Sequence, residues 1–323
     1  MSEFFLYNYD NLARVKKIAF EQSDLFNIYR NHYLRNQNSV KFYLDYLGED
    51  YKERSLILFR KNVPEIIIPA LCKKGELNFA NSATEVVSTL KGEEYKRAII
   101  FLFNKLRNRN KNQNVINCNF KSTDMLPKEI YSSVISMENI QVGLINCELT
   151  ESFRKSTLRK SYKSLLSWGE KNLSISLIDS ENPNYKEFLS FKQLHIQASG
   201  RKVRSDQTWE HQFNIIKDGF GYLVNAFLGD KHVSGCFIMH DQKTALYGVA
   251  ASDRELMSEK LPLNHFTLWR AINTAALKNI NLFILGDVEE NEANEKKENN
   301  IALFKRGFAS DIKIETNLKV HLN

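Results

Sequence analysis

Apolar residues recur with two different periods along the chain, and the pattern changes near residue 149. In the first half, β-rich runs predict strands, and a period near 3.6 predicts a long helix that Gly92 can split in two. The expected elements of this half are strands at 54–60 and 63–71 joined by a turn at 61–62, a helix over 84–106, and strands at 115–120 and 139–147. We expect a mixed α/β chain of two domains, residues 1–148 and 149–323.

The second half opens on an amphipathic helix over 153–171. Four apolar residues between Leu158 and Leu166 share one stripe, and Gly169 is placed to end the helix. The later elements are a strand at 173–178, helices at 184–197 and 206–217 (the second capped by Ser205 or Asp206), strands at 222–228, 232–240 and 244–250, a helix at 262–278, a strand at 281–286, a short helix ending at 305–307 and a strand at 312–322. The polar segment 287–300 lacks periodicity, so we expect an irregular loop there.

The composition is that of an ordinary globular protein, with 43% of the 323 residues hydrophobic and 26% charged. A net charge of +7 favours anionic partners such as phosphate, RNA or acidic lipid headgroups. The four cysteines show no metal-binding spacing, so we expect reduced core thiols and no metal. The N-terminus does not have the order of a signal peptide, and no apolar run reaches the roughly 20 residues of a membrane span. We therefore expect a soluble, cytoplasmic protein.

Five stretches of the second half resemble a known family. They are FRKSTLRKSYKSLLSWG (153–169), FKQLHIQASGRKVRSDQTWEHQ (191–212), YGVAASDRE (247–255), LPLNHFTLWRAI (261–272) and ALFKRGFASDI (302–312). Together they resemble the FemAB-like and BioF2-like acyltransferases of the GNAT superfamily. The most specific pieces are LH-x-x-x-x-GR-x-x-RS-x-x-x-W and FK-x-GF, although Ala309 stands where the family often has a second glycine.

The order of the expected elements supports this resemblance. Three antiparallel strands followed by a helix and a parallel strand match the GNAT fold. The resemblance implies two GNAT-like subdomains with mixed central sheets flanked by helices, the first of them degenerate. It also implies an N-acyltransferase that modifies an amine of a cell-envelope precursor, such as a nucleotide- or lipid-linked amino sugar. In the family the reacting carbonyl lies where the fourth and fifth strands separate, which here would be between residues 247–251 and 282–286.

The resemblance gives Lys305 a catalytic role. The lysine of the Phe304-Lys305 pair stabilises negative charge during transfer in the family, and an ammonium group at a forming oxyanion is well suited to this. The alternative is a surface lysine at a helix C-terminus, where the helix dipole favours a cation. His195 is a candidate general base for the incoming amine, and the alternative for it is a packed histidine.

Arg201 and Arg204 are candidate substrate-binding residues beside the start of the helix at Asp206. Guanidinium groups bind phosphate or carboxylate with two hydrogen bonds, which suits a phosphate-bearing acceptor. The alternative is pairing with local acids such as Asp206 and Glu210. The expected substrate-binding set is completed by Trp209 and Tyr247, which are equally suited to core packing, together with Ser252 and Phe304.

The sequence leaves the acyl donor open. Residues 252–261 contain no glycine and three acids against two bases, so they form a poor cradle for the diphosphate of acetyl-CoA. FemAB-like proteins that lack this loop can use aminoacyl-tRNA, and Lys155, Arg159 and Lys163 recur every fourth residue as candidate tRNA contacts. The same residues also fit the solvated face of a helix. Since BioF2-like relatives are described as acetyltransferases, both acyl-CoA and aminoacyl-tRNA remain candidates.

Two other classes of function stay open. A non-catalytic module that binds RNA or an anionic glycan would keep the fold without turnover. The first half could instead serve as the dimerisation face of a homodimer.

Overall fold

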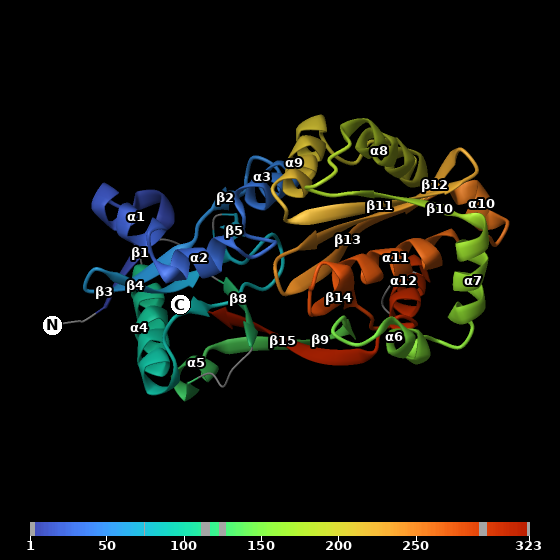
Figure 1. Ribbon diagram of the computed structural model, residues 1–323. Helices are drawn as coiled ribbons and strands as arrows, with labels where there is room; N and C mark the ends of the chain where they lie inside the picture. Colours follow the sequence, from blue (N-terminus) through green and yellow to red (C-terminus); the bar gives the residue numbers. More distant parts are fainter. Residues whose placement is uncertain (1–3, 74, 111–116, 123–126, 291–295, 322–323) are drawn as a thin grey trace. The chain divides into compact units, whose positions relative to one another are not determined.

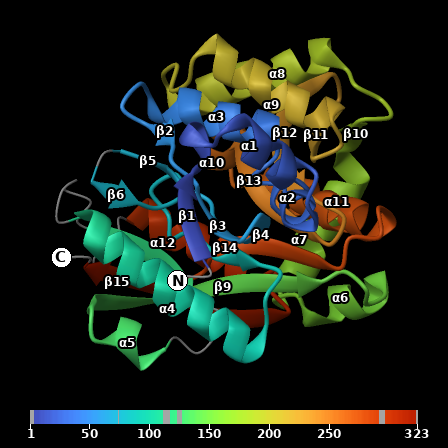
Figure 2. The same ribbon diagram turned by 90° about the vertical axis from the view of Figure 1, so that its left-hand side faces the viewer.

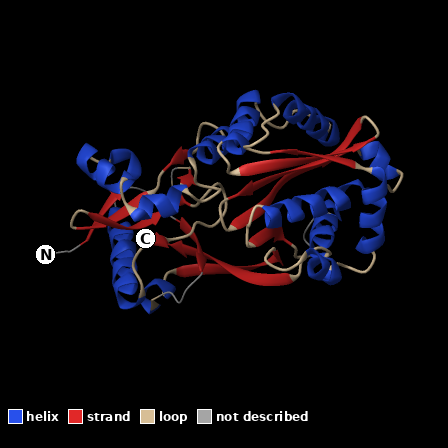
Figure 3. Cartoon of the chain, viewed as in Figure 1, coloured by secondary structure: helices blue, strands red, loops and turns tan. Residues whose placement is uncertain are grey.

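The computed structural model describes residues 4–73, 75–110, 117–122, 127–290 and 296–321. Helices and strands occur in both halves of the chain, so it is a mixed α/β protein (Figures 1 and 3). It divides into two compact units, one of residues 1–140 with 315–323 and one of residues 141–314. This division by contacts does not test whether residues 1–148 and 149–323 are separate domains, so the domain boundary between residues 148 and 149 stays a prediction.

The first unit is built on a four-stranded antiparallel sheet, in the order β1-β3-β4-β7 among the described strands. The expected hairpin is confirmed as β3 and β4, with Lys61 at a positive φ of 57° in its turn. The elements of this unit are β1 (Phe4–Asn8), η1 (Tyr9–Asn11), α1 (Arg14–Glu21), α2 (Asp24–Arg30), α3 (Gln37–Leu47), β2 (Lys52–Glu53), β3 (Leu56–Arg60), β4 (Val63–Ile68), β5 (Leu71–Cys72), β6 (Glu76–Leu77), β7 (Val87–Ser88), α4 (Gly92–Asn110), β8 (Asn117–Ser122) and α5 (Lys128–Tyr131), followed by β9 (Val134–Asn146), which continues into the second unit.

Helices cover both faces of this sheet. Successive residues of a strand point to opposite faces, so Leu56 and Leu58 pack into the core that includes α4, whereas Ile57 and Phe59 pack into the core of α1 and α2. Figure 2 shows β1 between α4 on one side and α1 and α2 on the other. The near-continuous apolar sequence of β3 reflects this two-sided burial.

The long helix expected over 84–106 is wrong in its first part. Val87 and Ser88 form β7 and pair with β4, and the helix α4 begins only at Gly92. Gly92 has a φ of +58°, which favours glycine, and it stands at the start of the helix rather than dividing it. A side-chain hydrogen bond from Ser88 Oγ to Glu65 O (3.2 Å) helps hold the upstream segment on the sheet.

The second unit contains a mixed sheet with the described strands in the order β10-β11-β12-β13-β14-β9. Only β13 and β14 are parallel neighbours in this series, which confirms the expected order of three antiparallel strands, a helix and a parallel strand. Its elements after β9 are α6 (Glu151–Thr157), α7 (Tyr162–Asn172), β10 (Ser174–Ile178), α8 (Tyr185–Ser199), α9 (Asp206–Lys217), β11 (Gly221–Leu228), β12 (Lys231–His240), β13 (Thr244–Ser252), α10 (Arg254–Ser258), α11 (Leu263–Leu277), β14 (Leu282–Asp287), α12 (Lys296–Arg306) and β15 (Asp311–His321), the last of which continues into the first unit.

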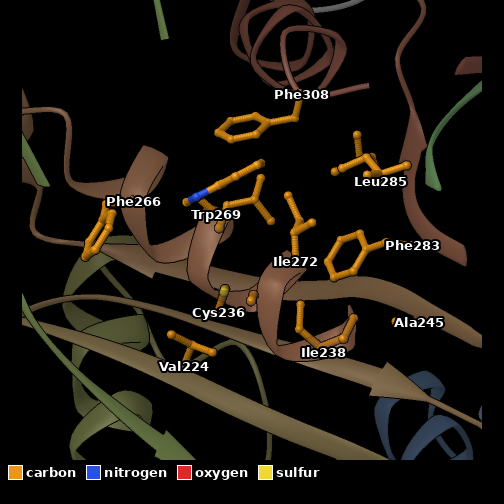
Figure 4. Close-up of a cluster of buried hydrophobic side chains, with 14 of the residues drawn as sticks. Val224, Cys236, Ile238, Ala245, Phe266, Trp269, Ile272, Phe283, Leu285 and Phe308 are labelled. Atoms are coloured by element: carbon orange, nitrogen blue, oxygen red, sulfur yellow. The ribbon is translucent and has the colours of Figure 1, made fainter. Parts of the chain in front are cut away.

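The core of this unit lies between the sheet and α11. Cys236 and Ile238 of β12 and Phe283 of β14 pack against Trp269 and Ile272 of α11 (Figure 4). The helices α8 and α9 pack on the sheet strands β11, β12 and β13, away from α11 (Figure 1). The sheet is therefore enclosed by helices on both faces.

The single helix expected over 153–171 is wrong, because the structure has two helices with a break at residues 158–161. In the break, Arg159 N donates to Gly307 O (2.9 Å), and the Tyr162 ring packs where a Cβ on Gly307 would stand only 2.4 Å away. Gly169 does not end the second helix but lies within it, where its missing Cβ admits the side chain of Phe266. Tertiary contacts thus override the helical period.

Part of the expected loop at 287–300 is also helical, since α12 begins at Lys296; residues 291–295 lie outside the described ranges. None of the helices in the described part of the chain has the length and apolar character that crossing a bilayer requires.

Candidate functional site

The parallel strands β13 and β14 pair over a short stretch and then separate. Thr244, Ala245 and Leu246 pair with Leu282, Phe283 and Ile284. Beyond these residues, β13 continues along β12 as far as Ser252, and β14 continues along β9 as far as Asp287. The strands therefore separate after Leu246 and Ile284, so that residues 247–251 and 285–286 of the expected opening lie beyond the paired stretch, whereas residues 282–284 are still paired with β13.

A β-bulge stands at this point of separation. Phe237 of β12 pairs with Val249 and Ile238 pairs with Tyr247, so Gly248 is the extra residue of β13. The residue inserted at a bulge drops out of the regular ladder, which frees its N–H to bind another group. Gly248 is exposed, and a Cβ there would stand 3.2 Å from Phe237 O. Sequence reasoning missed Gly248, although a glycine inside a strand pattern is a signal for a bulge.

Lys305 lies at the carboxyl end of β14. Its Nζ is 3.4 Å from Asp287 O, and it is also 3.4 Å from the position that a Cβ on Gly286 would occupy. Burial lowers the pKa of Lys305, and the nearby Asp287 acts in the opposite direction. The lysine is half-buried rather than fully solvated, so the ammonium group is held at the end of the strand that leaves β13.

Aromatic contacts fix the last turn of α12, which carries Lys305. The Tyr162 hydroxyl donates to Phe304 O (3.1 Å), and the Phe304 ring packs 5.3 Å from that of Phe308. His265 lies edge-on to Tyr162 with ring centroids 4.6 Å apart. Burial lowers the pKa of His265 to about 4, so its imidazole is neutral near pH 7. Phe304 is therefore a packing residue of the helix that positions Lys305.

His195 of α8, Trp209 of α9 and Arg204 of the loop between these helices form a separate cluster. His195 lies edge-on to Trp209 at 5.2 Å, and the Arg204 guanidinium lies 5.1 Å from the Trp209 ring centroid. Trp209 is 2% exposed, so protein groups cover its ring. Burial and the charge of Arg204 lower the pKa of His195 to about 4. The helix α8, which carries His195, packs on β12 and β13, whereas the helix α12, which carries Lys305, packs on β14. The two groups of candidate residues therefore lie on helices that pack on different strands of the sheet.

Arg201 and Asp206, the other two substrate-binding candidates near Arg204, are exposed. Arg201 points to solvent, and the Asp206 carboxylate accepts hydrogen bonds from Lys192 Nζ (2.7 Å) and Lys202 Nζ (3.0 Å), which lower the pKa of Asp206. The cap of α9 is Ser205, whose side chain accepts from Thr208 N (3.1 Å). Asp206, one of the two acids that the alternative paired with Arg201 and Arg204, is thus held by two lysines.

Tyr247 and Ser252, the two substrate-binding candidates on β13, both contact other side chains of the protein. Tyr247 directly precedes the bulge and packs against the core of α11, and burial raises the pKa of its hydroxyl. Ser252 is buried, and its hydroxyl donates to Asn264 Oδ1 and lies at hydrogen-bond distance (3.0 Å) from Ser234 Oγ. Tyr247 is the one of the two that borders the point where the strands separate.

The expected basic stripe is not a stripe in the structure. Lys155 lies on α6, Arg159 in the break and Lys163 on α7, so the fourth-residue spacing does not place them on one helix face. The reason is the break itself, which is held by the backbone hydrogen bond from Arg159 to Gly307.

In the segment after β13, a side chain of the segment itself caps the N-terminus of the helix α10. The Asp253 carboxylate accepts from Leu256 N (3.1 Å) at the first turn of α10, and Lys231 Nζ binds the same carboxylate at 2.7 Å. A diphosphate bound at this turn would lie beside the Asp253 carboxylate, which already accepts a hydrogen bond from the backbone. In the described ranges, no group of three histidine, cysteine, aspartate or glutamate side chains is arranged to hold a metal ion.

Comparisons with known proteins support the fold. No family model and no curated protein matches the chain. Among solved structures, FemX is similar over 87% of this chain and 95% of its own, with a TM-score of 0.57 and 12% identity. The C-terminal domain (DUF2156) of a putative lysylphosphatidylglycerol synthetase from Agrobacterium fabrum is similar over 95% and 93%, with a TM-score of 0.57 and 10% identity.

A tandem GNAT protein from the clavulanic acid biosynthesis pathway is similar over 99% of both chains, with a TM-score of 0.52 and 8% identity. At these identities the similarity concerns the fold alone, which this chain shares with FemX and with the tandem GNAT protein.

Proposed function

We propose that this protein is an N-acyltransferase that transfers an acyl or aminoacyl group to an amine of a cell-envelope precursor, a nucleotide- or lipid-linked amino sugar. The observation that carries the proposal is the position of Lys305 Nζ beside Gly286, at the end of the strand that separates from β13. The similarity of the fold to FemX supports the same class of reaction.

The chain's own groups supply the chemistry of such a transfer. An uncharged amine attacks the carbonyl carbon of the donor, a C–N bond forms, and the bond to the leaving oxygen or sulfur breaks. The N–H of Gly248 and the ammonium of Lys305 would stabilise the oxyanion that forms, and the leaving group takes the proton that the amine gives up. The lowered pKa of Lys305 suits its ammonium group to donate a proton to the leaving group, after which the neutral Lys305 amine takes up the proton that the attacking amine gives up.

The donor that we propose is aminoacyl-tRNA rather than acyl-CoA. In the GNAT arrangement a CoA diphosphate would bind to free N–H groups just after β13, and here the Asp253 carboxylate accepts from that turn. A second anion beside Asp253 would be repelled by it. An aminoacyl ester presents its carbonyl without a diphosphate at this position.

The test compares two lysine variants of α12. Lys305→Met should lower the transfer rate by about 10²–10³-fold, as does the loss of one oxyanion-stabilising group in other enzymes. Lys297→Met is the matched control, because Lys297 is exposed on the same helix, and its rate should equal the wild-type rate. Transfer is measured with radiolabelled aminoacyl-tRNA and, separately, acetyl-CoA, onto a panel of nucleotide-linked amino sugars.

Wild-type transfer by a folded Lys305→Met variant would contradict the mechanism. Transfer from acetyl-CoA but not from aminoacyl-tRNA would contradict the donor and leave the reaction class intact. A folded wild-type protein that uses neither donor would favour the non-catalytic binding module.

A further inference from the structure

Ser190 of α8 and His232 of β12 form a hydrogen-bonded pair outside the site described above. The Ser190 Oγ lies 2.8 Å from His232 Nδ1. On the other side of the ring, His232 Nε2 lies 3.1 Å from Ser234 O. Ser190 and His232 are both half-buried, so each keeps part of its surface in contact with solvent.

Close packing of α8 on the sheet brings the two side chains together. Gly235 of β12 admits the Phe191 ring, since a Cβ there would stand 2.6 Å from Phe191 Cδ2. One turn earlier on the helix, Glu187 Oε1 accepts a hydrogen bond from the Asn225 side-chain amide of β11 (3.0 Å). These two contacts hold the turn of α8 that carries Ser190 against β11 and β12. The geometry of the pair is therefore set by the packing of the helix.

The backbone oxygen of Ser234 determines which nitrogen of His232 carries the proton. A carbonyl oxygen can only accept a hydrogen bond, so Nε2 of the neutral ring is protonated and donates to Ser234 O. His232 Nδ1 is then the acceptor, and the Ser190 hydroxyl donates to it. A hydroxyl that donates to an imidazole, which is in turn oriented by a third group, is the arrangement of an activated nucleophile.

The surroundings of His232 suit a general base. Burial lowers the pKa of His232, while its hydrogen bonds with Ser234 and Ser190 and the charge of Glu187 act in the opposite direction. The imidazole is therefore neutral near pH 7 and can accept a proton. The Glu187 carboxylate favours the imidazolium ion that would form. The Phe227 ring stacks on His232 with ring centroids 4.9 Å apart, which holds the orientation of the imidazole.

We propose that Ser190 is a second reactive site, a nucleophilic serine that accepts an acyl group from an activated ester or thioester, with His232 as its general base. The Ser190 Oγ attacks the acyl carbon and forms a C–O bond, while His232 Nδ1 takes the hydroxyl proton. The bond from the acyl carbon to the leaving oxygen or sulfur breaks, and the leaving group receives the proton from His232. The product is an O-acylserine. Lys305 takes no part, so this site does not rest on the proposed function.

The experiment treats the full-length protein with p-nitrophenyl acetate near pH 7 and locates the acetyl groups by peptide mass spectrometry over time. Ser199 is the internal comparison, because it is exposed on the same helix and its hydroxyl donates to backbone oxygens such as His195 O (2.8 Å). Ser190 should be acetylated about 10²-fold faster than Ser199, which is the contribution of a positioned general base. This comparison is made within the wild-type protein and needs no variant to fold.

Two variants assign the roles. His232→Gln, checked for folding by thermal unfolding, should lower acetylation of Ser190 about 10²-fold and leave that of Ser199 unchanged. If the acetyl group is hydrolysed quickly, the wild type should instead release p-nitrophenolate continuously and Ser190→Ala should not, which supports the site equally. The proposal fails if Ser190 reacts no faster than Ser199 and Ser190→Ala releases p-nitrophenolate at the wild-type rate. It also fails if folded His232→Gln reacts at Ser190 as fast as the wild type.

Discussion

At the scale of single residues, the position of Lys305 depends on a glycine. Gly286 has a φ of +81°, and a Cβ there would stand 3.4 Å from Lys305 Nζ. Gly286→Ala should therefore strain the backbone at the end of β14 and place a methyl group in van der Waals contact with the ammonium group, lowering the free energy of unfolding by about 1 kcal/mol and transfer by about tenfold. Urea unfolding and the transfer assay measure the two effects.

Gly48→Ala is the control for backbone strain. Gly48 also has a positive φ, +96°, but nothing lies within 4 Å of a Cβ there. This variant should lose similar stability and keep full transfer. Equal transfer by Gly286→Ala and Gly48→Ala would show that the contact with Lys305 does not matter.

The residues of the site differ in how far the sequence could predict them. Lys305 was predicted from its resemblance to the FK-x-GF motif, and the structure has it in the last turn of α12, while its catalytic role stays a prediction. Gly248 and Gly286 were missed, since their roles depend on a strand register that no local pattern specifies. The roles predicted for His195 and Trp209 are untested, and both side chains pack against each other on α8 and α9.

At the scale of helices and strands, close packing of α7 on α11 depends on Gly169. A Cβ on Gly169 would stand 2.3 Å from Phe266 Cβ, and Phe266 is part of the buried core. Gly169→Ala should therefore lower the free energy of unfolding by about 1–3 kcal/mol, as overpacking does elsewhere. Ser167→Ala, an exposed change on the same helix, should alter it by less than about 0.5 kcal/mol. A Gly169→Ala variant as stable as Ser167→Ala would mean that the helices can move apart without cost.

Element order was predictable where apolar periods were long and turn signals lay between them. The strands β11, β12 and β13 were expected to within two residues at each end, because each is rich in apolar residues and short turns at 229–230 and 241–243 separate them. The break between α6 and α7 was not expected, since it is held by the hydrogen bond from Arg159 N to Gly307 O, about 150 residues away along the chain. Helical periodicity contains no information about such a partner.

At the scale of the whole molecule, buried neutral histidines make the fold sensitive to acid. Burial is the first cause that lowers the pKa of His195 and His265 to about 4 and that of His32 to about 3, against an ordinary value of 6.5. The unfolded chain therefore binds more protons than the folded chain as the pH falls below 6.5. The free energy of unfolding should be level above that pH and should fall progressively towards pH 4.

Urea unfolding between about pH 7.5 and about pH 4.5 measures this dependence. His265→Phe keeps an aromatic ring between Tyr162 and Phe304 and removes one of the titrating groups. Its free energy of unfolding should fall less steeply with pH than that of the wild type, because fewer protons are taken up on unfolding. Identical slopes for the two proteins would show that His265 is protonated equally in the folded and unfolded chain, and a wild-type protein with no slope would show the same for all three histidines.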